Sequence, residues 1–457
     1  MVRRVLLTHS NHVFSDPKQT ARMQPYPPMQ TILAAAMLRE NGIAVTLFDP
    51  TLRKEPLAEF QATLDRDKPT MVIVCEDDFN FLSKMCLAQN RALAFSMAKI
   101  SNDAGIAAFA HGSDASDHPV EYLKAGFSGV LTGEVEAALV ELAAGKDFEE
   151  IPGLVWISDC RPRFNRRPRL REDLDTLPRA AWDLVDIEEY RQVWMAAHGY
   201  FSINMVSSRG CPFQCNWCAK PIYGDKYHVR SPLAVATEML FLRNTLAPDH
   251  IWFADDIFSL SPRWTLEFAS AVEQLNARIP FRMQSRCDLM TRSTVSALAR
   301  AGCHEVWMGV ESGSQRILDA MNKGIRVQDI PQARENLRRH EIRACYFLQF
   351  GYPGETWTEI EETIEMVRQT RPDDIGVSVS YPLPGTRFHQ IVAAEMGPKA
   401  NWKDSSDLSM MFRGAYSTAF YRALADALHM EVRGGDASSV WNRVDQLRDA
   451  TRFAEVA

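Results

Sequence analysis

Three cysteines lie on one short stretch of the chain, Ser208-Arg-Gly-Cys-Pro-Phe-Gln-Cys-Asn-Trp-Cys218. Cys211, Cys215 and Cys218 have the spacing C-x3-C-x2-C, and a glycine and a proline beside the first cysteine favour a turn over a helix or strand. Thiolates are the ligands that iron-sulfur clusters and zinc prefer in proteins. The spacing therefore predicts a metal site on this loop.

The number of cysteines indicates what kind of metal site this is. A closed structural zinc site has four ligands and a cubane cluster has four irons, so three local thiolates leave one coordination position open. An open position would let a second molecule bind the metal. The alternatives are a zinc knuckle completed by His228, a chance cluster of cysteines, or one disulfide with a spare thiol.

The segment Cys-Pro-Phe-Gln-Cys-Asn-Trp-Cys resembles the cluster-binding motif of the radical S-adenosylmethionine (SAM) enzymes, including Trp217 before the last cysteine. The resemblance implies a [4Fe-4S] cluster whose open iron is chelated by the amino and carboxylate groups of SAM. An electron from the cluster then cleaves SAM to methionine and a 5'-deoxyadenosyl radical, which abstracts hydrogen from an unactivated carbon. A reducing partner such as a flavodoxin or ferredoxin would supply that electron.

The bulk composition is that of a globular protein. With 457 residues, 46% of them hydrophobic and 24% charged, the chain is long enough for two or three domains. The net charge of -7 argues against nucleic acid as a partner. No apolar run approaches the roughly 20 residues of a membrane span, and the first apolar run is too short for a signal peptide. We therefore expect a cytoplasmic protein without a membrane partner, whose nine cysteines are free thiols apart from the metal ligands.

Residues 1–147 alternate between strand-like and helix-like segments. This alternation predicts a doubly wound parallel sheet covered on both faces, of the Rossmann-like α/β class, with ligands at the carboxyl ends of its strands. The expected strands are Val5-Leu-Leu, Ile43–Phe48, Met71–Cys75, Ile106–Ala110 and Gly129–Leu131, and the clearest helices are Met29–Asn41 and Lys84–Asp103.

This first domain resembles the cobalamin-binding module that precedes the radical core in one large subfamily. The resemblance lies in Leu38-Arg-Glu-Asn-Gly-Ile-Ala-Val, in His111-Gly112 and in Gly133-Glu-Val-Glu136. It implies that Gly112 and Gly133 let a corrin or its nucleotide tail approach the backbone, which a side chain would block. It also implies that Glu134 and Glu136 accept hydrogen bonds from corrin amides; capping of the following helix is the alternative reading of these two glutamates.

The first domain also departs from that subfamily. It has no Asp-x-His-x-x-Gly segment to supply a histidine to cobalt, and it has one glycine at Gly112 where the family usually has two. An acidic cluster, Glu76-Asp77-Asp78, follows the third strand, where a cofactor edge would lie. The domain therefore either holds cobalamin without a protein ligand to cobalt or has become a wall of the substrate pocket.

The rest of the chain divides into three parts. Residues 148–198 are rich in proline and arginine and are predicted to be a linker. Residues 199–386 resemble the radical SAM core, a partial (β/α)6 barrel with its catalytic face at the carboxyl ends of the strands. Residues 387–457 are predicted to be helical.

Polar residues follow several strands of the predicted core. Asp255 and Asp256 leave an apolar strand, where burial of carboxylates is costly unless they are paired. The family resemblance gives this strand end the amino group of SAM, Glu311 the ribose hydroxyls, and Arg286 a carboxylate. An ion pair with a neighbouring acid is the alternative for Arg286.

Two outcomes of the radical chemistry stay open. In one, methylcobalamin in residues 1–147 donates a methyl group to a radical of a small-molecule substrate. In the other, a sugar-like polyol loses water without cobalamin, as in the radical SAM dehydratases of aminoglycoside antibiotic pathways, and a downstream reductase would then act on the product. Tyr223, Tyr227 or Cys287 could return an electron and a proton to the substrate radical, although either tyrosine could equally be an ordinary wall residue.

Two further alternatives belong to other functional classes. An iron-sulfur redox sensor or a zinc-stabilised binding protein would have no SAM contacts, so the acidic residues at successive strand ends argue against it. An RNA-modifying radical enzyme would need an added module with a basic and aromatic face, and the sequence shows no such module.

Overall fold

The computed structural model of the protein describes residues 4–454, which fall into two compact units. The boundary passes through the cysteine loop, so that Cys211 belongs to the first unit whereas Cys215 and Cys218 belong to the second. The first unit contains the chain up to Cys211 with Lys220–Arg230 and Asn401–Asp407, and the second contains Pro212–Ala219, Ser231–Ala400 and the chain from Leu408.

The first unit is built on a seven-stranded sheet. Its strands are β1 (Arg4–Thr8), β2 (Ala44–Leu47), β3 (Met71–Cys75), β4 (Ala107–His111), β5 (Gly129–Leu131), β6 (Leu154–Ser158) and β7 (Arg161–Phe164). They lie in the order β2-β1-β3-β4-β5-β6-β7, with parallel pairing up to β5 and antiparallel pairing from β5 to β7. The five parallel strands confirm the predicted sheet.

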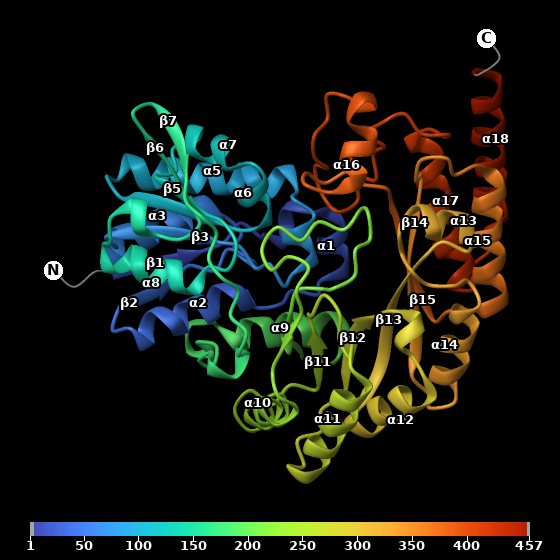
Figure 1. The fold of residues 1–457 in the computed structure, drawn as a ribbon, viewed down its shortest axis with the longest axis horizontal. Helices are drawn as coiled ribbons and strands as arrows, with labels where there is room; N and C mark the ends of the chain where they lie inside the picture. Colours follow the sequence, from blue (N-terminus) through green and yellow to red (C-terminus); the bar gives the residue numbers. More distant parts are fainter. Residues whose placement is uncertain (1–3, 455–457) are drawn as a thin grey trace. The chain divides into compact units, whose positions relative to one another are not determined.

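Helices cover both faces of this sheet (Figure 1). On β1, Val5 and Leu7 pack into one hydrophobic core with α2 and α8, whereas Leu6 enters the opposite core with α3 and α5. This alternation follows from the two-residue period of a strand. The helices are α1 (Pro17–Arg22), α2 (Met29–Glu40), α3 (Pro56–Asp67), α4 (Phe81–Lys84), α5 (Ala88–Asp103), α6 (Ser113–Asp117), α7 (Pro119–Lys124), α8 (Glu136–Ala144) and α9 (Ile187–His198), with short 3-10 turns η1 (Val13–Ser15), η2 (Phe148–Glu150), η3 (Leu174–Thr176) and η4 (Trp182–Leu184).

The segment predicted as a linker contributes two strands and a helix to the first unit. On β6, Leu154 and Val155 are buried and pair with Leu131 and Val130 of β5. Strand β7 is exposed along its whole length and forms the edge of the sheet. Its sequence, Arg-Pro-Arg-Phe, has the charge and the proline that suit an edge strand, and these same residues made the segment look like a loop.

In the second unit, five parallel strands lie side by side in chain order. They are β11 (His250–Phe253), β12 (Phe281–Ser285), β13 (Cys303–Glu311), β14 (Arg343–Phe350) and β15 (Asp374–Val379). Parallel neighbours need a crossover, and a helix follows each strand. All their carboxyl ends therefore share one edge of the sheet.

The helices of the second unit confirm the predicted alternation. Figure 1 shows α13, α14 and α15 along one side of β13–β15. The sixth predicted strand is β8 (Ser202–Met205), directly before the cysteine loop. The helices are α10 (Pro232–Thr245), α11 (Pro262–Gln274), α12 (Arg292–Ala301), α13 (Gln315–Ala320), α14 (Asp329–Arg338), α15 (Trp357–Thr370), α16 (Arg387–Val392), α17 (Thr418–Val432) and α18 (Ser438–Ala454), with short 3-10 turns η5 (Cys287–Leu289) and η6 (Ala393–Glu395).

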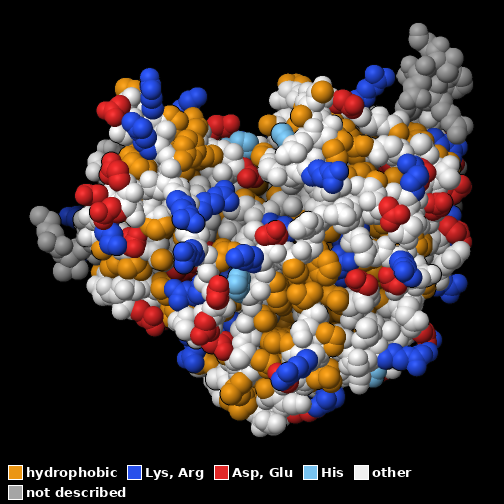
Figure 2. Space-filling model, in the orientation of Figure 1, with side chains coloured by type: hydrophobic (Ala, Val, Ile, Leu, Met, Phe, Trp, Pro, Cys, Tyr) orange, Lys and Arg blue, Asp and Glu red, His pale blue; other side chains and the backbone are white. Residues whose placement is uncertain are grey.

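The surface carries both signs of charge. On the face shown in Figure 2, acidic and basic side chains both occur across the molecule. Within residues 4–454, no helix combines the length and the apolar character needed to cross a bilayer. The predicted helical region after residue 387 contains α16, α17 and α18, separated by a mainly irregular stretch from Met396 to Ser417.

Candidate functional site

A short antiparallel strand pair closes the base of the cysteine loop. β9 (Ser208–Arg209) pairs with β10 (His228–Val229), and the chain between them forms no helix or further strand. Gly210 has a φ of 76°, and a Cβ atom there would lie 2.0 Å from the carbonyl oxygen of Lys226. Any other residue would clash, so glycine fixes where the loop begins.

The three predicted metal ligands are partly exposed. None of the nine cysteines, all of which lie in the described part of the chain, forms a disulfide, which contradicts the disulfide alternative. Among the residues that the structure describes, no three Cys, His, Asp or Glu side chains converge as ligands of one metal ion, so the zinc knuckle with His228 is not seen. A cubane binds each thiolate through a separate iron. Three thiols on one loop therefore fit a [4Fe-4S] cluster with an open fourth iron.

The second half of the loop is anchored to the end of α13. The backbone N–H of Asn216 donates to the carbonyl oxygen of Met321 at 2.8 Å, and its side-chain Nδ2 donates to that of Ala320 at 2.7 Å. Trp217 packs against the hydrophobic cluster that contains Ile317 and Phe388. These contacts fix the backbone between the second and third cysteines.

Arg286, at the end of β12, braces the same loop. Its Nε and Nη2 donate to the carboxylate of Asp288 at 2.9 and 3.1 Å, and its Nη1 donates to the carbonyl oxygen of Lys323 at 2.8 Å. The guanidinium carbon lies 3.7 Å from the centre of the Phe213 ring, a close cation-π contact. The structure thus shows the ion pair that was the alternative for Arg286, together with a loop contact that sequence reasoning missed.

Glu311 forms a buried ion pair at the end of β13. Its Oε1 accepts a hydrogen bond from Nζ of Lys323 at 2.7 Å, and the two side chains are 5% and 7% exposed. The φ of Glu311 is 64°, a left-handed conformation that costs about 1–2 kcal/mol in a residue other than glycine. The surrounding contacts must hold this strained backbone in place.

Lys323 is close to the cysteine loop. Its Nζ lies 5.8 Å from the centre of the Trp217 ring. Burial by itself would lower the pKa of this ammonium, but attraction to Glu311 and then to Cys215 raises the pKa above its ordinary value. Sequence reasoning did not identify Lys323; the available signal was a lone lysine between Asn322 and Gly324, in a turn that carries no hydrophobic pattern.

The other predicted strand-end residues differ in burial. Asp255 is 1% exposed after β11, whereas Asp256 is exposed, so the first of the two carboxylates is the one held inside the unit. Cys287, in η5 after β12, is buried, and burial together with the nearby Asp288 raises the pKa of its thiol to about 12. Cys287 is therefore a protonated thiol at neutral pH. Asp255, Arg286 and Glu311 all follow neighbouring parallel strands, and so lie at one edge of the sheet.

The two candidate tyrosines lie in the first unit. The hydroxyl of Tyr223 donates to Oε1 of Gln30 at 2.6 Å, and its ring stacks on Phe79 with centres 5.6 Å apart. This buried arrangement supports the reading of Tyr223 as a wall residue. Tyr227 is partly exposed and directly precedes β10.

Glu134 and Glu136 bind an arginine of the cysteine loop. Nη1 and Nη2 of Arg209 donate to Glu134 and Glu136, and all three side chains are no more than 7% exposed. The Arg209 guanidinium carbon also lies 5.1 Å from the centre of the Tyr223 ring, and Nε2 of Gln30 donates to Glu136 at 3.2 Å. The two glutamates were expected either to accept corrin amides or to cap the following helix. In the structure their carboxylates form an ion pair with Arg209, a role that neither expectation included.

Arg209 could have been found in the sequence. It is the sole charged residue between Phe201 and Cys218, in a segment that otherwise reads as an apolar strand and a metal loop. A charged residue in such a segment must be paired if it is buried.

The acidic cluster Glu76-Asp77-Asp78 is buried at the carboxyl end of β3. One oxygen of each carboxyl group accepts a backbone N–H at 2.9–3.1 Å. The second oxygen of each has no hydrogen-bond partner among the described residues. That of Asp78 lies 3.6 Å from Nδ1 of His111, whereas those of Glu76 and Asp77 have no such neighbour in the described part of the chain. Burial raises the pKa of Glu76 to about 7 and that of Asp77 to about 6.

These orphaned acceptors bear on whether the first unit can hold cobalamin. Buried oxygens without partners suit a ligand with many N–H donors, such as the amide groups of a corrin. Gly112 has a φ of 143°, and a Cβ atom there would lie 2.7 Å from Cβ of Glu76, so a protein side chain already fills that space. Gly133 has a φ of 77° and lies near Pro168. The carboxyl oxygens of this acidic cluster fit the amide groups at the edge of a corrin. The space beside Gly112, in contrast, is occupied by the side chain of Glu76.

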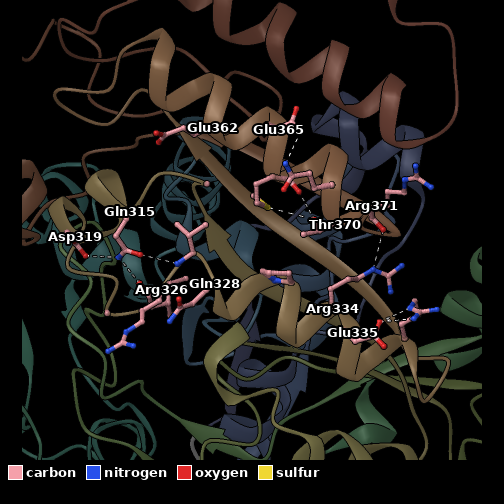
Figure 3. A pocket seen from close by; sticks show the side chains of 18 residues that line it. Gln315, Asp319, Arg326, Gln328, Arg334, Glu335, Glu362, Glu365, Thr370 and Arg371 are labelled. Atoms are coloured by element: carbon pink, nitrogen blue, oxygen red, sulfur yellow. Dashed lines mark hydrogen bonds and ion pairs between the residues drawn. The ribbon is translucent and has the colours of Figure 1, made fainter.

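A separate groove lies among the helices of the second unit (Figure 3). It has a cavity volume of about 1460 Å³ and is lined by residues of α13, α14 and α15. Gln315 spans its floor, where Nε2 donates to Asp319 at 2.8 Å and Oε1 accepts the N–H of Val327 at 3.0 Å. None of the predicted cofactor residues, all of which lie in the described part of the chain, lines this groove.

Comparison with known proteins identifies the second unit. Residues 205–367 match the model of the radical SAM superfamily. The uncharacterized methyltransferase PH0819 of Pyrococcus horikoshii is 27% identical over 314 residues, which cover 64% of this chain and 67% of the relative. The chain spans 54% of the length of a bacteriochlorophyllide d C-12(1)-methyltransferase of Chlorobaculum tepidum and 53% of that of an anaerobic magnesium-protoporphyrin IX monomethyl ester cyclase of Synechocystis.

Solved structures share the fold over most of this chain. The methyltransferase TsrM from Kitasatospora setae, described with cobalamin and a [4Fe-4S] cluster bound, aligns with a TM-score of 0.69 at 19% identity, over 87% of this chain and 76% of TsrM. OxsB, described with aqua-cobalamin and SAM bound, aligns with a TM-score of 0.72 at 14% identity, over 99% of this chain and 72% of OxsB. At these identities the likeness shows the fold. Residues 205–367, which contain the cysteine loop and the parallel strands β11 to β14, are therefore similar to the radical SAM superfamily of enzymes.

Proposed function

We propose that the protein binds a [4Fe-4S] cluster through Cys211, Cys215 and Cys218, and uses it to cleave SAM and generate a radical on a small-molecule substrate. The observation that carries this proposal is the set of three partly exposed cysteines on one loop inside the matched family region. When bound, the cluster supplies the electron that splits the sulfonium of SAM into methionine and a 5'-deoxyadenosyl radical.

The residues of this chain would bind and orient SAM. Asp255 is a buried carboxylate and would accept the amino group of SAM, as the family resemblance implies. Glu311 would accept the ribose hydroxyls, as the family resemblance implies. Asn216 and the Arg286–Phe213 contact hold the cysteine loop in one conformation, so the reacting groups are positioned before SAM binds.

We propose methyl transfer with cobalamin as the outcome of the radical step. The support is the fold of the first unit, the methyltransferase names of relatives, and the carboxyl oxygens of Glu76 and Asp77 that have no hydrogen-bond partner among the described residues and would accept corrin amides. Cobalamin, when bound, would carry the methyl group. The substrate class in this proposal is a secondary metabolite or a sugar-like small molecule.

A second candidate is dehydration of a sugar-like polyol without cobalamin. The side chain of Glu76 occupies the space beside Gly112. The two imidazoles at the β1 and β4 ends are also engaged, His9 with Asp49 at 3.1 Å and His111 with the carbonyl oxygen of Gly133 at 3.1 Å. These contacts favour a first unit that shapes the pocket instead of holding a corrin, and a downstream reductase would then act on the product.

The electron donor and the compartment belong to the same proposal. A reduced flavodoxin or ferredoxin would deliver the electron, and the free thiols suit the reducing cytoplasm.

The test is anaerobic reconstitution with iron, sulfide and hydroxocobalamin, followed by desalting, metal analysis and an absorption spectrum. About four irons with stoichiometric cobalamin would support methyl transfer, and four irons without cobalamin would support dehydration. Cys215→Ala should lose iron, whereas Cys160→Ala, an exposed cysteine outside the loop, should keep it. Zinc in place of iron, with no SAM cleavage under dithionite, would refute the proposal.

A further inference from the structure

We propose that Lys323 is a positioning residue whose buried ammonium charge raises the reduction potential of the cluster at the cysteine loop, and that Glu311 moderates this effect. The inference rests on the proposed function, because it needs a cluster on Cys215 and its two partners. It assigns to the β13 edge a redox role in addition to SAM binding.

The structure holds the Lys323 ammonium in one place. Nζ is 2.7 Å from Oε1 of Glu311, in a pair whose members are 7% and 5% exposed. The space for this pair exists because position 309 is a glycine: a Cβ atom there would lie 2.6 Å from Nζ and 2.7 Å from Oε1. The backbone of Lys323 is fixed as well, since its carbonyl oxygen accepts a hydrogen bond from Arg286.

The fixed ammonium is directed toward the cysteine loop. Nζ lies 5.8 Å from the ring centre of Trp217, which stands between two of the cysteines. An ammonium has three N–H donors, and among the described residues Glu311 is the single hydrogen-bond partner of Nζ. Two donors of the ammonium are therefore left over on the side of the cysteine loop.

A charge in this place must act on the cluster. Reduction adds one negative charge to the cluster, and a nearby cation stabilises that form more than the oxidised form. The interaction is poorly screened, because both side chains of the pair are buried. Glu311 carries the opposite charge at the same place, so it offsets part of the effect of Lys323.

The size of the effect follows from Coulomb's law. With an effective dielectric constant of about 20 and a separation of about 10 Å, removing one charge changes a one-electron equilibrium constant by on the order of tenfold. For one electron, a tenfold change corresponds to about 59 mV.

The experiment is a redox titration of reconstituted protein without SAM, followed by the spectrum of the reduced cluster. Lys323→Met should lower the potential by about 59 mV or more, Lys323→Arg should leave it near that of the wild type, and Glu311→Gln should raise it. Lys99→Met, which changes a lysine that is 73% exposed, is the matched control and should leave the potential unchanged.

The outcomes separate this inference from the proposed function. Failure of the wild-type protein to take up four irons would refute the proposed function itself. If Lys323→Met takes up a full cluster and its reduction potential equals that of Lys99→Met, the inference is overturned and the proposed function still stands. If Lys323→Met does not take up the cluster, two other variants can be compared, Glu311→Gln and the double variant Lys323→Met/Glu311→Gln. These two differ only by the charge of Lys323, so equal reduction potentials in them would also overturn the inference.

Discussion

Replacing Arg209 by methionine tests whether the first unit holds the cysteine loop through a buried ion cluster. Arg209 is 3% exposed and donates to both Glu134 and Glu136, which are 7% and 2% exposed. Methionine keeps much of the apolar stem but removes the charge and both hydrogen bonds. Two buried carboxylates then lie together without a counter-charge.

The expected destabilisation is large. Removing one partner of a buried ion pair costs about 3–5 kcal/mol, which is a substantial share of a total stability of about 5–15 kcal/mol. The loss should also depend on pH. Without Arg209, burial raises the folded-state pKa of the glutamates above their unfolded value of about 4.3, so the folded state binds protons that the unfolded state does not. Stability of the variant should therefore fall further as pH rises from 5 to 8.

The assay is urea and thermal unfolding at pH 5 and pH 8, with iron content after reconstitution as a second readout. Arg39→Met is the matched control, because Arg39 pairs with Asp183 at the surface with side chains 36% and 69% exposed, where pairs contribute about 0–1 kcal/mol. Because Arg209 is two residues before Cys211, its loss should also reduce iron binding. An Arg209→Met protein as stable as Arg39→Met at pH 8 would refute the ion-cluster reasoning.

Three further substitutions test other contacts. Gly112→Ala places a Cβ atom 2.7 Å from Glu76 and should cost about 1–3 kcal/mol in urea unfolding, more than Gly42→Ala, which meets nothing within 4 Å at a φ of 73°. Glu76→Gln should raise the melting temperature at pH 8 more than at pH 5, because the raised pKa of about 7 makes the ionised Glu76 destabilising above its unfolded pKa; an equal change at both pH values would contradict this. Tyr223→Phe should lose about 1 kcal/mol of stability and keep its rate of SAM cleavage, whereas a large fall in that rate, with SAM binding unchanged, would restore a catalytic role.

Much of the fold could be predicted because its signals are local. Met71–Cys75 and Gly129–Leu131 are strands with the predicted bounds, since buried parallel strands are short apolar runs that end at polar or glycine residues. Strand β7 was missed for the opposite reason: an exposed edge strand needs no apolar run, and its pairing with β6 is a contact between chain segments. The predicted domain boundaries at residues 147, 198 and 386 stay predictions.

The candidate site divides in the same way. The cysteine spacing alone pointed to the metal loop, because three thiols within a few residues form a local pattern that can be read from the sequence. The roles given to Arg286 and Glu134 depended on resemblance, and the structure shows each with a protein partner, Asp288 and Arg209. Asp288 is 2 residues from Arg286 in the sequence, whereas Arg209 is 75 residues from Glu134. Sequence spacing could therefore suggest the first pair but not the second.

The sequence by itself determined the loop chemistry, the alternation of strands and helices, and which residues follow each strand, because all three depend on residues close together in the chain. The tertiary structure decided which charges are paired. Lys323 and Glu311 meet because β13 and the turn after α13 pack together, and Gly309 leaves room for them. Pairing energy depends on distance and burial in space, and neither quantity can be read from the order of residues.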